Sequence, residues 1–81
     1  MTIIKERTIY EKPHDFRVVA YLYDNGSIRI QNEIYDDGTF MPEPGWYPTE
    51  DVFIPVDKMG TFYGVISEFY QFVFGSIDID R

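Results

Sequence analysis

Hydrophobic and polar positions alternate with a period of two along the first half of the chain, a pattern typical of β-strands that bury one face. This alternation predicts three strands, at residues 3–10, 16–23 and 27–35. A break at residues 12–15 separates the first two strands, and Asp24-Asn25-Gly26 is a turn signal between the second and the third. The first half of the chain is therefore predicted to form an antiparallel sheet.

The turn at Gly26 decides the pairing of the second and third strands. A three-residue loop, with Gly26 in the left-handed conformation, pairs Leu22 with Ile28 and Ala20 with Ile30. A two-residue turn mixes apolar and charged residues on each face, so we predict the three-residue loop. One face then carries Phe16, Val18, Ala20, Leu22, Ile28, Ile30 and Ile34, and the other carries Arg17, Val19, Tyr21, Tyr23, Arg29, Gln31, Glu33 and Tyr35.

The alternation ends after the third strand. Asp36-Asp37-Gly38 is a second turn signal, and residues 41–48 are rich in proline, which lacks the amide donor that a regular central strand needs. Residues 52–56 predict a short fourth strand, at an edge of the sheet because Pro55 has no donor.

Helical spacing replaces alternation near the C-terminus. A helix is predicted over residues 58–74, with Asp57 as its N-cap and Gly75 at its end. One apolar stripe of this helix consists of Met59, Phe62, Tyr63, Ile66, Phe69, Tyr70 and Val73. The predicted fold is one α+β domain over residues 1–81, a four-stranded antiparallel sheet followed by one C-terminal helix. We expect the stripe to pack on Phe16, Val18, Leu22, Ile28, Ile30 and Ile34.

The predicted helix is more apolar than one sheet face requires, since ten of its 17 residues are hydrophobic. One interpretation is a deeply buried core helix. The other is a homodimer, because a domain of 81 residues without cysteine has a thin core and no disulfide to support it. We favour the homodimer, with Gly64, Val65, Tyr70 and Phe72 at the interface.

Catalytic and metal-binding patterns are missing from the sequence. The paired carboxylates (Asp36 and Asp37, Glu50 and Asp51, Asp78 and Asp80) are neighbours along the chain, whereas acid–base catalysis needs groups that converge from different elements. The single histidine, His14, is predicted to be a surface loop residue. We expect no enzyme, no cofactor and no metal. Without a signal peptide or a long apolar run, a cytoplasmic protein that does not bind membranes is expected.

Charge is unevenly distributed within a net charge of −7. Residues 1–31 carry five basic and four acidic side chains, and residues 32–81 carry two basic and ten acidic ones. The net charge argues against indiscriminate binding to duplex nucleic acid, which depends on neutralising phosphates.

Arginines and aromatic residues alternate on the face opposite the predicted core, at Arg17, Tyr21, Tyr23, Arg29, Gln31 and Tyr35. Rings on a sheet can stack with unpaired bases while arginines hold phosphates, so this face is a candidate for single-stranded nucleic acid. Two other interpretations stay open. Arg17 pairs with Glu33 and Tyr21 packs on Arg29 as ordinary surface, or the proline-rich segment with Trp46 covers the face.

Four strands followed by one helix, with Ile34-Tyr35-Asp36-Asp37-Gly38 at the end of the third strand and then Met41-Pro42, resemble the positive-cofactor-four family. Residues 54–57, leading into the helix, resemble that family's last strand and helix cap. The resemblance covers roughly residues 16–69. It implies a transcriptional coactivator, or a protein of replication, that binds single-stranded DNA as a homodimer formed through its helices.

The family is lysine-rich before its last strand, where this chain has Glu43, Glu50 and Asp51. An alternative function follows from these acids: a small, phage-like inhibitor that binds a basic protein surface by imitating the charge of nucleic acid. Its candidate contact residues are Asp36, Asp37, Glu43, Trp46, Tyr47, Glu50 and Asp51.

Overall fold

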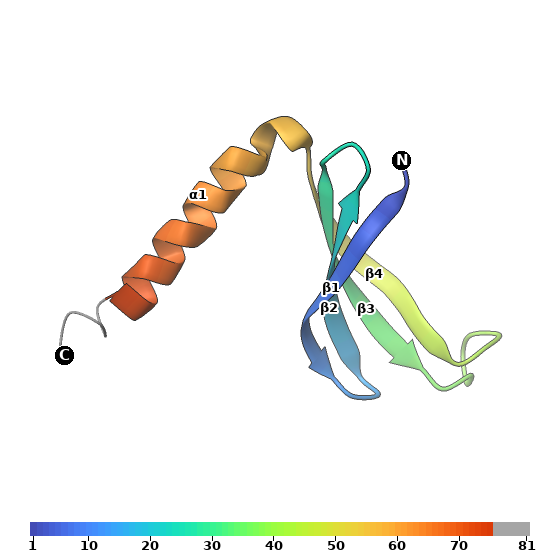
Figure 1. Cartoon of the computed structure of the whole chain (residues 1–81). Helices are drawn as coiled ribbons and strands as arrows, with labels where there is room; N and C mark the ends of the chain where they lie inside the picture. Colours follow the sequence, from blue (N-terminus) through green and yellow to red (C-terminus); the bar gives the residue numbers. More distant parts are fainter. Residues whose placement is uncertain (76–81) are drawn as a thin grey trace.

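The structure, a computed structural model, describes residues 1–75; Asp78 and Asp80 lie outside this range. One antiparallel sheet is built in chain order from β1 (Ile3–Lys12), β2 (Phe16–Tyr23), β3 (Ile28–Asp36) and β4 (Gly45–Ile54) (Figure 1). A 3₁₀ turn, η1 (Val56–Lys58), leads into α1 (Met59–Tyr70), and a π-helical turn, η2 (Gln71–Gly75), continues it. The predicted order of four antiparallel strands and one C-terminal helix is confirmed.

The predicted register of β2 and β3 is also confirmed. Leu22 pairs with Ile28 and Ala20 with Ile30. Gly26 has a φ of 88°, the left-handed conformation that the three-residue loop requires. The amide of Gly26 donates to the carbonyl of Tyr23 over 3.0 Å and closes the turn.

The two sides of the sheet have the composition that this register predicts. We call one side the aliphatic face; its residues are Val18, Ala20, Leu22, Ile28, Ile30, Val52 and Ile54. The other is the arginine–aromatic face, with Arg17, Val19, Tyr21, Tyr23, Arg29, Gln31, Glu33, Tyr35, Trp46 and Phe53. The better-buried side is the arginine–aromatic face, where Val19 is 2% and Glu33 is 4% exposed. Its large side chains cover one another.

Strand β4 is longer than predicted, because it begins at Gly45 and includes Pro48. The predicted bounds of the fourth strand, 52–56, are therefore wrong, although residues 45–48 do not form a regular central strand. Pro48 is tolerated because β4 is an edge strand, as predicted, and because the pairing with β3 is irregular next to Glu33. The added residues place Trp46 beside Tyr35, and Phe53, within the predicted strand, lies beside Arg29.

The start of the helix differs from the prediction. Asp57 lies inside η1, and the N-cap position of α1 is Lys58, which makes no side-chain capping hydrogen bond. Pro55 is extended, with φ −67° and ψ 156°, so the chain leaves β4 before the helical segment begins. Val56 then packs against the β2–β3 turn, where a Cβ on Gly26 would lie 2.9 Å from its Cγ2 atom.

Helix α1 extends away from the sheet (Figure 1), and none of its residues is buried. The expected packing of the helical stripe on the aliphatic face is therefore wrong within a single chain. The radius of gyration is 16.3 Å, against about 12 Å for a compact domain of this length. No helix among residues 1–75 combines the length and hydropathy needed to cross a membrane.

Candidate functional site

Four π-systems form a row across one end of the arginine–aromatic face. The ring of His14, from the β1–β2 turn, meets Tyr35 edge to face with 4.9 Å between ring centroids. Tyr35 meets Trp46 in the same manner at 5.3 Å, and the guanidinium of Arg17 lies 4.7 Å from the centre of the Trp46 ring. The row draws on the β1–β2 turn, β2, β3 and β4, so the sheet itself holds it in place.

A second group of rings and one arginine lies toward the other end of the same face. The guanidinium of Arg29 is 5.6 Å from the ring of Tyr23 and 5.8 Å from that of Phe53. Its Nε atom is 3.1 Å from Asp51 Oδ2, yet this buried N–H makes no hydrogen bond within residues 1–75. The ion pair therefore leaves donor capacity on Arg29.

Glu33 joins three neighbouring side chains between these two groups. Its Oε1 accepts from Arg17 Nε at 2.6 Å, and its Oε2 accepts from Tyr21 Oη at 2.6 Å and from Gln31 Nε2 at 2.7 Å. Burial opposes ionisation of Glu33, but these hydrogen bonds outweigh it and lower the pKa of its carboxyl. Burial, with the hydrogen bond to Glu33, raises the pKa of Tyr21 to about 12. Glu33 is thus a buried anion that orients its partners.

The six predicted contact residues do share one face, but in different environments. Arg17, Tyr21 and Gln31 are bound to Glu33, as the ordinary-surface interpretation anticipates for Arg17. The side chain of Tyr23 is buried, whereas Tyr35 is partly exposed. Tyr23 is therefore the one buried member of the set, and Arg17, Tyr21 and Gln31 are the members bonded to Glu33.

Sequence reasoning missed two contributors to this face, His14 and Phe53. It placed Trp46 either over this face, as one open interpretation, or among the contact residues of the acidic alternative; the structure places Trp46 on the face. Phe53 lies on this face because it pairs directly with Arg29. Trp46 reaches the face only because the pairing of β3 with β4 shifts by one residue between Asn32 and Glu33; uninterrupted alternation would place Tyr47 there instead. His14 has no comparable signal, because its position depends on a turn in which its own φ is 60°.

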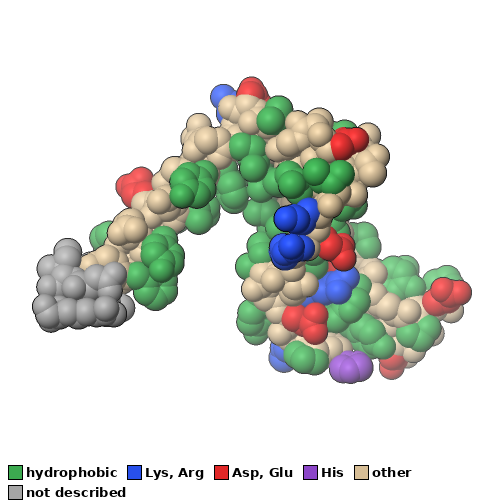
Figure 2. Space-filling view, viewed as in Figure 1, with side chains coloured by type: hydrophobic (Ala, Val, Ile, Leu, Met, Phe, Trp, Pro, Cys, Tyr) green, Lys and Arg blue, Asp and Glu red, His purple; other side chains and the backbone are tan. Residues whose placement is uncertain are grey.

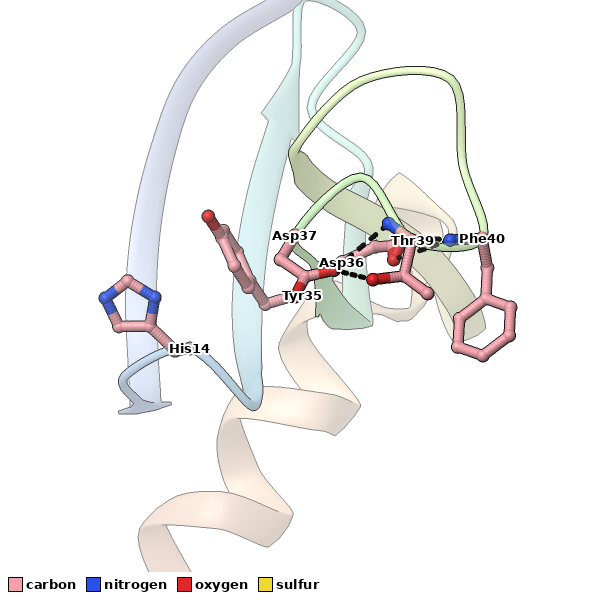
Figure 3. Close-up of a pocket in the computed structure, with 6 residues that line it drawn as sticks. All are labelled: His14, Tyr35, Asp36, Asp37, Thr39 and Phe40. Atoms are coloured by element: carbon pink, nitrogen blue, oxygen red, sulfur yellow. Dashed lines mark hydrogen bonds between the residues drawn. The ribbon is translucent and has the colours of Figure 1, made fainter.

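An open pocket of about 400 Å³ lies beside the row, lined by His14, Tyr35, Asp36, Asp37, Thr39 and Phe40 (Figure 3). His14 and Tyr35 stand on one side of it and Phe40 on the other (Figure 3). Its carboxylates support the loop: Asp36 accepts from the amides of Phe40 and Met41, and Asp37 accepts from Thr39. The hydroxyl of Thr39 lowers the pKa of the Asp37 carboxyl. The Phe40 side chain is 90% exposed.

The acidic residues of the alternative function do not gather on one surface. Asp36 is buried beneath its loop, and Asp51 pairs with Arg29 on the arginine–aromatic face. Glu50 lies opposite Asn32, on the other side of the sheet. Tyr47 donates to the carbonyl of Glu43, so it serves the loop as well.

Among residues 1–75, no three His, Asp or Glu side chains are close enough together to hold a metal ion. Comparisons with protein-family models, with curated proteins and with solved structures found no match to this chain.

Proposed function

We propose that this protein is a non-enzymatic module that binds single-stranded nucleic acid on its arginine–aromatic face. The observation that supports this most is the row formed by His14, Tyr35, Trp46 and Arg17. Partly exposed rings on a rigid sheet offer flat surfaces on which unpaired bases stack, at roughly 1–3 kcal/mol per base. Bases inside a duplex cannot reach such surfaces, so the ligand is a single strand.

The second group, around Arg29, extends the proposed surface. Tyr35 lies six positions after Arg29 on β3, which at about 3.3 Å per residue places the two groups roughly 20 Å apart. One extended strand can contact both. The Glu33 network between them keeps the Arg17 plane against Trp46, which limits the conformational entropy lost on binding.

Electrostatics contribute little in this proposal. The face has two arginines, and each already has a carboxylate within 3.1 Å. Neutralising at most two phosphates gives a slope of log K against log salt concentration of about −1.4 or shallower for a single strand. Stacking then supplies most of the affinity, in keeping with the net charge of −7.

Trp46 permits a direct test because it is the only tryptophan. Titration with an unstructured oligonucleotide at low salt should quench its fluorescence, and a matching duplex should not. Repeating the titration at several salt concentrations gives the slope of log K against log salt concentration. No quenching and no change in the anisotropy of a labelled oligonucleotide would contradict the proposal, and capture of a basic protein instead would favour the charge-imitating alternative.

Two substitutions and one control locate the binding surface. Tyr35→Ala should weaken binding about tenfold, the loss of one stacked base. Arg29→Gln should weaken it less and make the salt slope shallower. Lys58→Gln removes the same charge from a residue of η1, off the sheet, and should leave both the affinity and the slope unchanged. Equal effects of Arg29→Gln and Lys58→Gln would argue for nonspecific attraction.

A further inference from the structure

Two apolar surfaces are left uncovered within one chain. The first is the stripe on α1 and η2, on which Ile66 is 49%, Phe69 is 61% and Tyr70 is 59% exposed. The second is the aliphatic face, where Val52 is 59% exposed and lines a groove of about 220 Å³ with Val18 and Ile30 and with the polar residues Asn32, Glu50 and Asp51. Figure 2 shows hydrophobic side chains along the helix, which stands apart from the sheet.

The chain exposes more surface than a compact monomer of its mass, by an amount comparable to one side of a homodimer interface. The chain exposes 6395 Å², with a mass of 9.6 kDa. A compact monomer of that mass exposes about 5,100 Å², so roughly 1,300 Å² per chain is in excess. Obligate homodimers bury about 1,000 Å² or more on each partner.

The junction between β4 and α1 keeps the helix off its own sheet. Extended Pro55 directs the chain away from β4, and Val56 is held against Gly26 at the β2–β3 turn. The helix and the aliphatic face match in length. Residues 59–75 span about 25 Å as a helix, and eight to ten residues of strand span about 26–33 Å.

We propose that a second copy of this chain covers both surfaces reciprocally: the helical stripe of each copy packs on the aliphatic face of the other. A two-fold dimer contains this contact twice, so both apolar surfaces of each chain are covered at once. The arginine–aromatic faces stay open on the opposite sides of the two sheets. The dimer does not depend on the nucleic-acid proposal.

Self-association and two variants test the proposal without nucleic acid. The wild type should sediment as a dimer, at twice 9.6 kDa, at micromolar concentration. Ile66→Asp places a charge in the stripe and Val52→Asp places one on the aliphatic face; each should abolish the dimer. Thr61→Asp, at an exposed position away from the stripe, should leave the dimer intact.

Mixing the two variants separates the reciprocal contact from other arrangements. A heterodimer of Ile66→Asp with Val52→Asp retains one intact contact, the wild-type helix on the wild-type sheet, so native mass spectrometry should detect it. A monomeric wild type overturns the proposal. So does a Val52→Asp variant that still dimerises, which indicates helix-to-helix pairing, and so does failure of the mixture to form a heterodimer.

Both substituted side chains are exposed in the single chain, so each variant should fold. Circular dichroism checks this. If an aspartate variant does not fold, Ile66→Thr and Val52→Thr replace the pair. Each removes apolar area twice per dimer, so the dissociation constant should rise about tenfold; an unchanged constant overturns the proposal.

Discussion

Glu33 is the residue on which the arginine–aromatic face depends. It is 4% exposed, it carries a charge, and it accepts from Arg17, Tyr21 and Gln31. A buried carboxylate is unfavourable unless its oxygens are hydrogen-bonded, and here both are. Arg17, the arginine of the π-system row, is therefore held by its ion pair with Glu33 and by the Trp46 ring, over which its guanidinium lies.

Replacing Glu33 with glutamine should lower the free energy of unfolding by about 2 kcal/mol at pH 7, since hydrogen bonds to the charge weaken and Arg17 loses its partner. Chemical denaturation measures this. Glu50→Gln, at an exposed residue on β4, is the matched control and should change stability by less than about 0.5 kcal/mol. Equal effects of the two variants would contradict an organising role for Glu33.

The lowered pKa of Glu33 also predicts an acid dependence of stability. Its folded pKa is lowered from the ordinary value of 4.5, so the unfolded state binds the proton more readily. The stabilisation is complete above that value and is lost as pH falls through the folded pKa. Denaturation between pH 2 and 6 should therefore show a steeper loss in the wild type than in Glu33→Gln.

The raised pKa of Tyr21 predicts a loss of stability at high pH. Its pKa is raised from 10.0 to about 12, so its contribution is complete below pH 10 and is lost as pH rises toward 12. Absorbance titration of the folded protein should show one tyrosine ionising late, and Tyr21→Phe should remove that step. A titration in which the tyrosines of both proteins ionise together near pH 10 would show that the Glu33 contact is absent.

The junction of β4 with the helical segment depends on one glycine. Gly26 needs its left-handed φ, and it also leaves room for Val56. Gly26→Ala should therefore destabilise the protein by about 1–2 kcal/mol from backbone strain, with a further cost from the contact at 2.9 Å.

Adding Val56→Ala to the Gly26→Ala variant should recover only the stability lost through that contact. The effects of the two substitutions on the free energy of unfolding should therefore not be additive. Gly60→Ala is the control. A Cβ there meets no atom within 4 Å, and the helix should gain up to about 1 kcal/mol. Additive effects at residues 26 and 56 would mean that the helical segment does not rest on this turn.

At the scale of the whole molecule, the proposed dimer predicts that stability depends on association. A radius of gyration of 16.3 Å and a helix with no buried residue make this chain less compact than a globular monomer of its length. If the dimer forms as proposed, the apparent Tm should rise by several degrees when the protein concentration is raised a hundredfold. A Tm independent of concentration would indicate that the sheet is stable alone.

The elements and the pairing of β2 with β3 were predictable because they follow from local signals. Alternation defined the strands, and the three-residue turn at Gly26 set a register in which Leu22 meets Ile28. A slip by one residue moves every apolar side chain to the other face, so the sequence specifies this pairing strongly. The order of four strands and one helix follows from the same patterns.

Tertiary structure decided what covers each face. Local pattern began the fourth strand at residue 52, yet the exposed edge of the sheet accommodates Pro48 in a longer strand and places Trp46 against Tyr35. The pattern placed Arg17 and Tyr21 on the outer face, but their mutual bonds to Glu33 make that face the better buried one. The amphipathic helix indicated an apolar contact without naming the surface it meets. Periodicity records which side chains share a face; whether that face is covered by its own chain depends on the junction at Pro55 and Val56.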